Sequence, residues 1–284
     1  MGIIWGLTAA LFWGVADFVS REASQRVGVY RGVLYAHLVS FVALSVVLLV
    51  RPLVVSWSPQ TIALAFVLGC SNTGGALLLY YGLAKGQISV VSPIGASFAA
   101  VTLALSLLSG AELSTAKIGA LVLTLAGVIL AATPPPQSSV VANPREQRRA
   151  IWASLVAALL FGTTFWGLGF VTDDLGPFLP VWLGRVASML LLPLLALPLR
   201  QKLGRPPRHA WPALLTVGLV DSGANVAYNA GLLSDKTGAV AVLGALFSPV
   251  TVLLALVFLH ERLTAWQWLG VAMICGGVGW VSAK

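Results

Sequence analysis

The feature that most constrains this chain is a series of long windows without any charged residue. Six of them span residues 52–84, 86–111, 118–144, 150–172, 186–199 and 237–259. About 20 apolar residues in a helix are enough to cross the hydrocarbon core of a bilayer. The whole chain has only 17 Lys and Arg and 9 Asp and Glu among 284 residues, too few charges to cover a soluble surface. Most of the chain is therefore expected to be surrounded by lipid.

The formal net charge of +8 is consistent with a lipid bilayer as partner and does not require nucleic acid. Lys and Arg collect in the cytoplasmic loops of membrane proteins, which explains the positive balance. Cys70 and Cys275 both lie in apolar runs, where they indicate neither a disulfide framework nor a metal site. The sequence has no phosphate-binding loop of the GxxxxGK[ST] type. We predict no enzyme activity, no metal, no cofactor, no nucleic acid and no obligate protein partner.

The chain is predicted to be an all-α membrane protein with ten transmembrane helices. Turn residues and charges place the spans at residues 3–21, 30–50, 60–81, 87–109, 115–133, 151–171, 177–199, 211–232, 238–259 and 264–282. The main interruption has three consecutive prolines followed by several arginines. We interpret residues 134–150 as a linker.

An internal repeat divides the chain into two halves, residues 1–133 and 151–284. Superposed identities include Gly95 on Gly244, Phe98 on Phe247 and Glu112 on Glu261 at a shift of 149, and Gly14 on Gly162 at a shift of 148. Each half then has five helices. Because five is odd, the second half enters the membrane from the opposite side, and such inverted repeats are typical of secondary transporters.

The last segment of the chain has a distinctive series of residues that the first half repeats in weaker form. The series is His260, Glu261, Arg262, Leu263, Thr264, Trp266, Gln267, Gly270, Gly276 and Gly277, and its first-half counterpart is Glu112, Leu113, Ser114, Lys117, Gly119 and Gly127. This series resembles the closing signature of the EamA-type members of the drug/metabolite transporter superfamily, and Trp13 with Gly14 resembles the opening pattern of that family. The resemblance implies a ten-helix exporter of metabolites or amino acids, similar to the aromatic amino-acid exporters of the bacterial inner (plasma) membrane.

The distribution of basic residues predicts that both termini lie outside the cell. The cytoplasmic loops would then contain Arg21, Arg26, Arg31, Lys85, Arg145, Arg148, Arg149, Arg200, Lys202, Arg205, Arg208 and Arg262. The external segments would contain only Arg51, Lys117, Lys236 and Lys284. The family resemblance implies the reverse orientation, with cytoplasmic termini.

Four ionisable residues are predicted to lie within spans, where each costs about 2.5 to 3.5 kcal/mol on insertion scales. Arg185 and Asp221 fall near the middle of consecutive spans, so they either neutralise each other or bind substrate. A guanidinium can bind the carboxylate of an amino acid through two hydrogen bonds. Asp17 either pairs with Arg21 one helical turn later or forms a proton or cation site. His37 is either a hydrogen-bond partner for a neighbour or a proton relay.

A polar stripe marks the eighth span, where Asp221, Asn225, Tyr228 and Asn229 fall on one helix face. Such a stripe in lipid must face a protein interior or a water-filled path, and a polar seam between helices is the alternative. The repeat shift places Asn72 and Tyr80 on the matching stripe of the third span.

Aromatic and proline residues near span centres are further candidates for substrate contacts and helix breaks. Trp13 and Trp166 are candidates to contact a flat apolar substrate, although ordinary packing would also explain them. Pro93 and Pro249 are candidates to break the fourth and ninth spans.

These observations predict a secondary transporter that exports neutral, aromatic or hydrophobic amino acids or similar metabolites by alternating access. The predicted substrate-binding residues are Arg185, Asn72, Tyr80, Asp221, Asn225, Tyr228, Asn229, Trp166 and Trp13, with Asp17 and His37 as the coupling or proton site. The alternative is a proton-coupled multidrug exporter of lipophilic cations, which would depend on a membrane-embedded acid such as Asp17 or Asp221.

Overall fold

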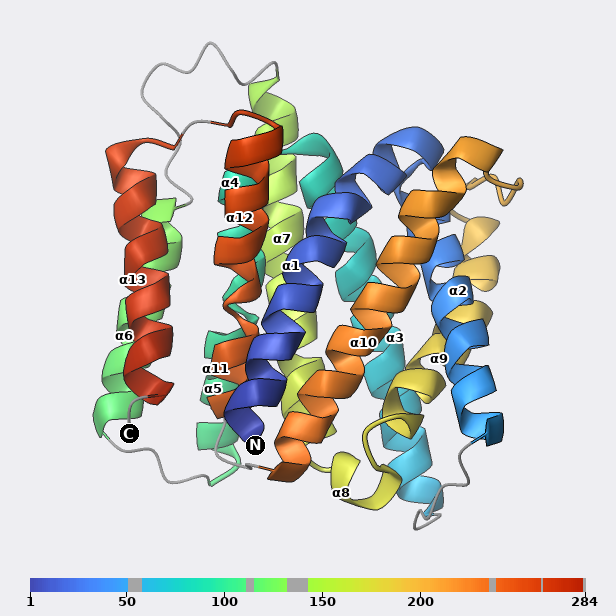
Figure 1. Cartoon of the computed structure of the whole chain (residues 1–284), viewed down its shortest axis with the longest axis horizontal. Helices are drawn as coiled ribbons and strands as arrows, with labels where there is room; N and C mark the ends of the chain where they lie inside the picture. Colours follow the sequence, from blue (N-terminus) through green and yellow to red (C-terminus); the bar gives the residue numbers. More distant parts are fainter. Residues whose placement is uncertain (51–57, 111–114, 132–142, 235–238, 262, 283–284) are drawn as a thin grey trace.

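The computed structural model describes residues 1–50, 58–110, 115–131, 143–234, 239–261 and 263–282, and all regular elements within these residues are helical. Figure 1 shows the helices running roughly side by side as a bundle. In chain order they are α1 (Gly2–Val27), α2 (Val29–Val50), α3 (Pro59–Lys85), α4 (Ile88–Ala96), α5 (Phe98–Leu108), α6 (Thr115–Ala131), α7 (Pro144–Leu168), α8 (Thr172–Leu175), α9 (Leu179–Ala196), the 3₁₀ turn η1 (Arg208–Ala210), α10 (Trp211–Ser234), α11 (Ala239–Gly244), α12 (Phe247–Phe258) and α13 (Ala265–Ser282).

Six segments of the described chain are long and apolar enough to cross a membrane. They are α1, α2, α3, the consecutive pair α4 and α5, α7 and α9. Their large apolar side chains face outward as well as inward, because Leu11, Val46 and Leu194 are each more than half exposed at the surface of the bundle. Exposed apolar side chains on long helices are stable in hydrocarbon and not in water, so this is a membrane protein.

One predicted boundary is wrong. The helix α7 begins at Pro144, inside the segment interpreted as a linker at residues 134–150. The side chain of Asn143 accepts hydrogen bonds from the backbone N–H groups of Arg145 and Glu146, which satisfies two donors at the start of the helix. Proline at the first helical position needs no such partner. The rest of the predicted linker, residues 134–142, lies outside the described residues.

The predicted fourth and ninth spans are each formed by two consecutive helices instead of one. The helix is interrupted at Ser97, between α4 and α5, and at residues 245–246, between α11 and α12. Pro93 lies inside α4, before the break at Ser97, whereas Pro249 lies in the first turn of α12 and has no N–H to donate to the carbonyl of Ala245 at the second break. The two breaks fall at positions related by the repeat shift, since 97 plus 149 is 246.

Matching contacts recur in the two halves. The helix α1 packs against α10 and α12, and α7 packs against α3 and α5. A Cβ atom added at Gly14 would lie 2.5 Å from the Cβ of Val250, and one added at Gly162 would lie 2.4 Å from the Cβ of Val101. Both glycines therefore allow a close approach of helix backbones that any side chain would block. Hydroxyl groups at the same crossings donate to the two glycine carbonyls, 3.2 Å from Thr251 to Gly14 and 3.1 Å from Thr102 to Gly162.

The remaining long helices, α6 and α13, pack against each other at one side of the bundle (Figure 1). The cavity described next is lined by residues of α1, α2, α3, α5, α7, α10 and α12.

Candidate functional site

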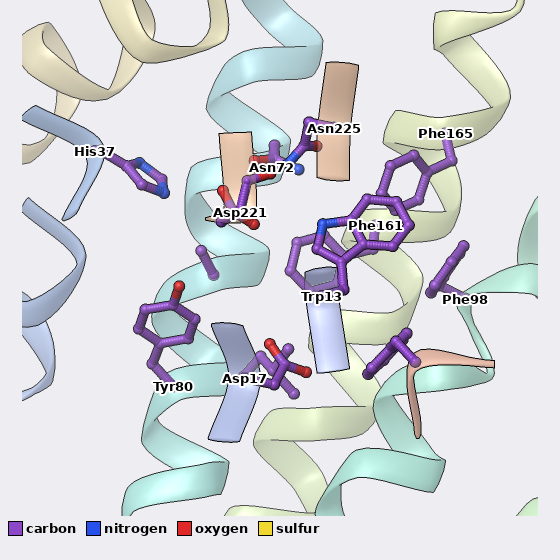
Figure 2. Close-up of a pocket in the computed structure, with 13 residues that line it drawn as sticks. Trp13, Asp17, His37, Asn72, Tyr80, Phe98, Phe161, Phe165, Asp221 and Asn225 are labelled. Atoms are coloured by element: carbon purple, nitrogen blue, oxygen red, sulfur yellow. Dashed lines mark hydrogen bonds between the residues drawn. The ribbon is translucent and has the colours of Figure 1, made fainter. Parts of the chain in front are cut away.

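A central cavity lies between the two halves (Figure 2), with about 480 Å³ of space not filled by atoms, including the part that is open to the surroundings. Its wall combines aromatic rings with carboxylate, amide, imidazole and phenol groups. The lining residues are Trp13, Asp17, His37, Asn72, Ala76, Leu79, Tyr80, Phe98, Phe161, Phe165, Asp221, Asn225 and Phe247. Pockets that are mostly apolar with a few placed polar groups are typical of small-molecule sites.

The aromatic part of the wall is built by both halves around Trp13. The ring centroid of Trp13 lies 5.2 Å from Phe165, 6.2 Å from Phe98 and 6.4 Å from Phe247. The rings of Phe98 and Phe247 are nearly parallel, with an interplanar angle of 9° and a centroid separation of 6.2 Å. These two residues were not predicted as site residues, although their superposition in the repeat marked them as equivalent. The cluster forms a rigid surface suited to a flat apolar group.

Asp17 brings a carboxylate into this aromatic setting. Its side chain is 6% exposed, and its Oδ2 atom has no hydrogen-bond partner among the described residues. The predicted local pair with Arg21 is wrong, because Arg21 reaches α3 and donates to the carbonyls of Leu83 (3.0 Å) and Gly86 (2.9 Å). Figure 2 shows Asp17 and Tyr80 on one side of the cavity and Asp221 on the other. The hydroxyl of Tyr80 points into the space between the two acids.

Arg185 and Asp221 form the ion pair that one of the two sequence interpretations expected. Nη2 of Arg185 donates to Oδ2 of Asp221 at 2.5 Å, and the side chains are 3% and 20% exposed. The same guanidinium donates through Nε to Ser40 (2.8 Å) and through Nη1 to His37 (3.1 Å). All three nitrogens of Arg185 are therefore held by the protein, and the residue is not part of the central cavity wall.

His37 has both ring nitrogens engaged. A guanidinium can only donate, so Nε2 of His37 accepts from Arg185 and the ring proton lies on Nδ1. Nδ1 lies 2.8 Å from the hydroxyl of Ser188, which accepts this proton in a hydrogen bond. Ser188 in turn lies 2.5 Å from the hydroxyl of Thr73. His37 thus connects the ion pair to α3 and α9 as a neutral imidazole.

A second cavity of about 330 Å³ meets the first at Asn72 and Asn225, which line both. It lies between α3, α7, α9 and α10, and it extends toward the end of the bundle where α8 lies (Figure 1). Its wall includes Arg185 and Asn229. The amide of Asn229 donates to the carbonyl of Pro177 at 3.1 Å, whereas its Oδ1 has no partner within the described part of the chain. The two cavities are therefore neighbours that share Asn72 and Asn225 in their walls.

Two residues predicted to contact substrate lie outside both cavities. Tyr228 is fully buried, and its ring packs 4.6 Å from Phe165 and 5.6 Å from Trp13 between centroids. Trp166 donates from its indole to the hydroxyl of Ser109 at 3.0 Å. Tyr228 belongs to the predicted polar stripe of α10 but supports the aromatic wall from behind. All four residues of the stripe lie inside the bundle, but only Asp221, Asn225 and Asn229 line a cavity.

An apolar helical bundle with a mixed aromatic and acidic cavity at its centre defines a multi-pass membrane protein of the transporter class. The family model for the EamA-like transporter family matches residues 1–133 and again residues 148–283. The chain therefore belongs to the EamA-like transporter family, and its resemblance to the drug/metabolite transporter superfamily is confirmed. Membership implies a membrane transporter rather than an enzyme.

Two further comparisons agree with this family. An uncharacterized protein of Methanocaldococcus jannaschii is 30% identical over 129 residues, which are 45% of this chain and 93% of that protein. That relative is thus about half as long as this chain. A solved crystal structure has a TM-score of 0.76 at 15% sequence identity and covers 99% of this chain and 96% of its own, which shows a shared fold.

Proposed function

We propose that this protein is a secondary transporter with ten spans in two inverted five-helix repeats, working by alternating access. Three observations support this architecture. The family model matches each half separately, and α1 and α7 make equivalent contacts. In Figure 1, α1 begins at the end of the bundle where α8 lies, whereas α7 begins at the opposite end. Inverted halves of this kind can exchange conformations and so move the opening from one face to the other.

The proposed substrate is a small molecule with a flat apolar part and a protonated amino group, exported in exchange for protons. The observation that carries this proposal is the Asp17 carboxylate beside the aromatic wall of the cavity, whose Oδ2 has no hydrogen-bond partner among the residues that the structure describes. A buried carboxylate without a partner is stabilised by a proton or by a cation. The rings around it favour a cation and an apolar group in the same place. A proton and an amine therefore compete for one site, which couples their movements.

Neutral aromatic amino acids are the second candidate, and the polar groups opposite Asp17 favour them. Asn72 and Asn225 contribute amides to the central cavity on the side away from Asp17 (Figure 2). Amide N–H groups can donate to a substrate carboxylate while Asp17 receives the ammonium group. In this variant of the proposal the amides take the role that the sequence suggested for Arg185, whose nitrogens already have protein partners.

The proposed location is the bacterial inner membrane with both termini outside. Figure 1 shows α1 ending and α7 beginning at the same end of the bundle, which brings Arg21, Arg26, Arg145 and Arg148 to one face. The positive-inside rule makes this face cytoplasmic.

Transport into proteoliposomes tests the substrate class. We expect uptake of a labelled aromatic amine to require an imposed proton gradient and to fall about 100-fold in Asp17→Asn, because a charged hydrogen bond worth about 3 kcal/mol is lost. Glu22→Gln is the matched control, since Glu22 lies on the same helix, is exposed and pairs with Arg26. Saturable tryptophan uptake without a gradient would favour the second candidate. Amine uptake by Asp17→Asn at the wild-type level would refute the role of Asp17.

A further inference from the structure

Two hydrogen-bond chains at the centre of the bundle are related by the internal repeat. A shift of 148 carries His37 to position 185 and Ser40 to Ser188, and a shift of 149 carries Thr73 to Ser222. Contacts between backbones support these equivalences. A Cβ atom added at Gly218 would lie against the carbonyl of Ala36. A Cβ atom added at Gly69, the repeat equivalent of Gly218, would lie against the Cα of Gly184, which is the repeat equivalent of Ala36 at a shift of 148.

The first chain runs from His37 to Ser188 (2.8 Å), then to Thr73 (2.5 Å), and from Thr73 to the carbonyl of Gly69 (2.8 Å). The second chain starts from Arg185 and is the counterpart of the first at each step. Arg185 donates to Ser40 (2.8 Å), Ser40 bonds Ser222, and Ser222 donates to the carbonyl of Gly218 (2.5 Å). The two chains meet where Arg185 donates to His37. The pseudo-two-fold axis therefore passes between His37 and Arg185.

One bond at this centre has no counterpart. Arg185 pairs with Asp221, and the equivalent residues in the first half are His37 and Asn72. Both nitrogens of His37 already bond Arg185 and Ser188, so His37 has no group left for Asn72. The ion pair thus exists in the second half and is not repeated in the first.

The packing around this centre is also unequal. The helix α1 packs against α2 and α3, and Arg21 ties α1 to the carbonyl groups of Leu83 and Gly86 at the end of α3. Within the described residues α7 makes no comparable packing with α9 or α10, and the position equivalent to Arg21 is Gly169. The second cavity lies on this less packed side. The bundle is therefore closed at the end where α1 meets α3 and more open at the end where α8 lies.

We infer that Arg185 is a positioning residue whose ion pair with Asp221 selects the conformation open at the α8 end. This inference rests on the inverted-repeat transporter proposed above. On this inference the pair forms in the arrangement that α9 and α10 have here, and it separates when α9 and α10 take the arrangement of α2 and α3, in which the equivalent His37 and Asn72 are not bonded to each other. The free energy of the pair is then the coupling between Asp221 and the direction of opening. Neutralising Asp221, by a proton or by a bound cation, removes this barrier.

The repeat allows a test by exchange. The substitutions His37→Arg, Arg185→His, Asn72→Asp and Asp221→Asn together move the ion pair into the first half without changing the composition of the chain. Accessibility is measured with a water-soluble maleimide on two reporters in a Cys70→Ala, Cys275→Ala background. Leu168→Cys reports on the second cavity, and Ser20→Cys is its repeat equivalent on the closed side, since 20 plus 148 is 168.

We expect Leu168→Cys to react faster than Ser20→Cys in the otherwise unchanged protein, and the order to reverse in the exchanged protein. The ratio of the two rates should change by about tenfold or more. An unchanged ratio in a folded exchange variant would overturn the inference. If the exchange variant does not fold, the single variant Asp221→Asn tests the inference. Loss of the ion pair should bring the labelling rates of Leu168→Cys and Ser20→Cys closer together, and an unchanged ratio of these rates would contradict the inference. Maleimide labelling needs no substrate. The ratio of labelling rates can therefore be interpreted even if the protein does not transport the proposed substrate.

Discussion

The two halves of this protein agree where helices touch and differ in polar side chains at the centre of the bundle. Gly14 and Gly162 make the same close approach to equivalent helices. Among the side chains that face the centre, Phe98 and its equivalent Phe247 are identical, whereas the pairs that differ include Asp17 and Phe165, His37 and Arg185, Asn72 and Asp221, and Tyr80 and Asn229. Close backbone contact tolerates little change, whereas a cavity wall tolerates exchange of side chains. The comparison teaches that the scaffold is symmetric and that its chemistry is not.

The largest expected asymmetry concerns the ion pair. Arg185→Ala should lower the free energy of unfolding by about 3 to 5 kcal/mol, because it leaves the Asp221 carboxylate uncompensated. His37→Ala, at the equivalent position, removes a hydrogen bond from the charged Arg185 and one to Ser188 but leaves Arg185 paired with Asp221, and it should cost about 1.5 to 3 kcal/mol. Denaturant unfolding of the purified protein measures both.

The double variant Arg185→Ala, Asp221→Asn is the control for this asymmetry. It should be more stable than Arg185→Ala alone, because neither charge is left unpaired. Equal stability of the double and the single variant would show that Asp221 does not depend on Arg185.

The next expected effect is equal in the two halves. Gly14→Ala and Gly162→Ala should each destabilise the protein by about 1 to 3 kcal/mol, because each new Cβ would lie 2.5 Å or less from a valine Cβ on the facing helix. Gly204→Ala is the control, since no atom lies within 4 Å of its added Cβ. Thermal unfolding in detergent should give two similar decreases in Tm and no decrease for the control. A large decrease at one glycine alone would break the structural equivalence of the halves.

The smallest expected effect involves Glu261, which accepts hydrogen bonds from the backbone N–H groups of Ile88 (3.1 Å) and Ser89 (2.9 Å) at the start of α4. A carboxylate at a helix N-terminus satisfies free donors and complements the helix dipole. Glu261→Gln should therefore lower stability by about 1 kcal/mol. Glu112→Gln tests whether the first half has the same cap, because Glu112 is the repeat equivalent of Glu261. Glu112 itself lies outside the described residues. Equal losses of stability are expected, and no loss for Glu261→Gln would contradict the capping role.

Several parts of the site could be predicted from local features of the sequence. The depth of Arg185 and Asp221 in apolar spans was enough to propose an ion pair, because lipid leaves opposite charges few other partners. The stripe on α10 indicated an inward polar face for the same reason. The helix α7 begins inside the predicted linker because the side chain of Asn143 accepts hydrogen bonds from the first backbone N–H groups of that helix.

Other parts depended on contacts between distant segments. The pairing of Asp17 with Arg21 satisfied the helical spacing, yet Arg21 donates to the carbonyl groups of Leu83 and Gly86 at the end of α3, and Asp17 lines the central cavity. Trp166 looked central in its span, and its rotation about the helix axis placed it against Ser109 instead of the cavity. Helical spacing gives the depth of a residue and leaves open which neighbour its side chain meets.

The sequence alone was sufficient to identify a membrane protein, most of its spans, its division into two related halves and its family, because hydropathy, repeats and signature residues are properties of the chain read in order. The tertiary structure was needed to place Asp17 among aromatic rings, with its Oδ2 unpaired within the described part of the chain, and to pair Arg185 with Asp221 through a shared network. It was also needed to distinguish the more open end of the bundle from the closed one. These features arise where helices from both halves cross, and which side chains meet at a crossing depends on the packing of the whole bundle.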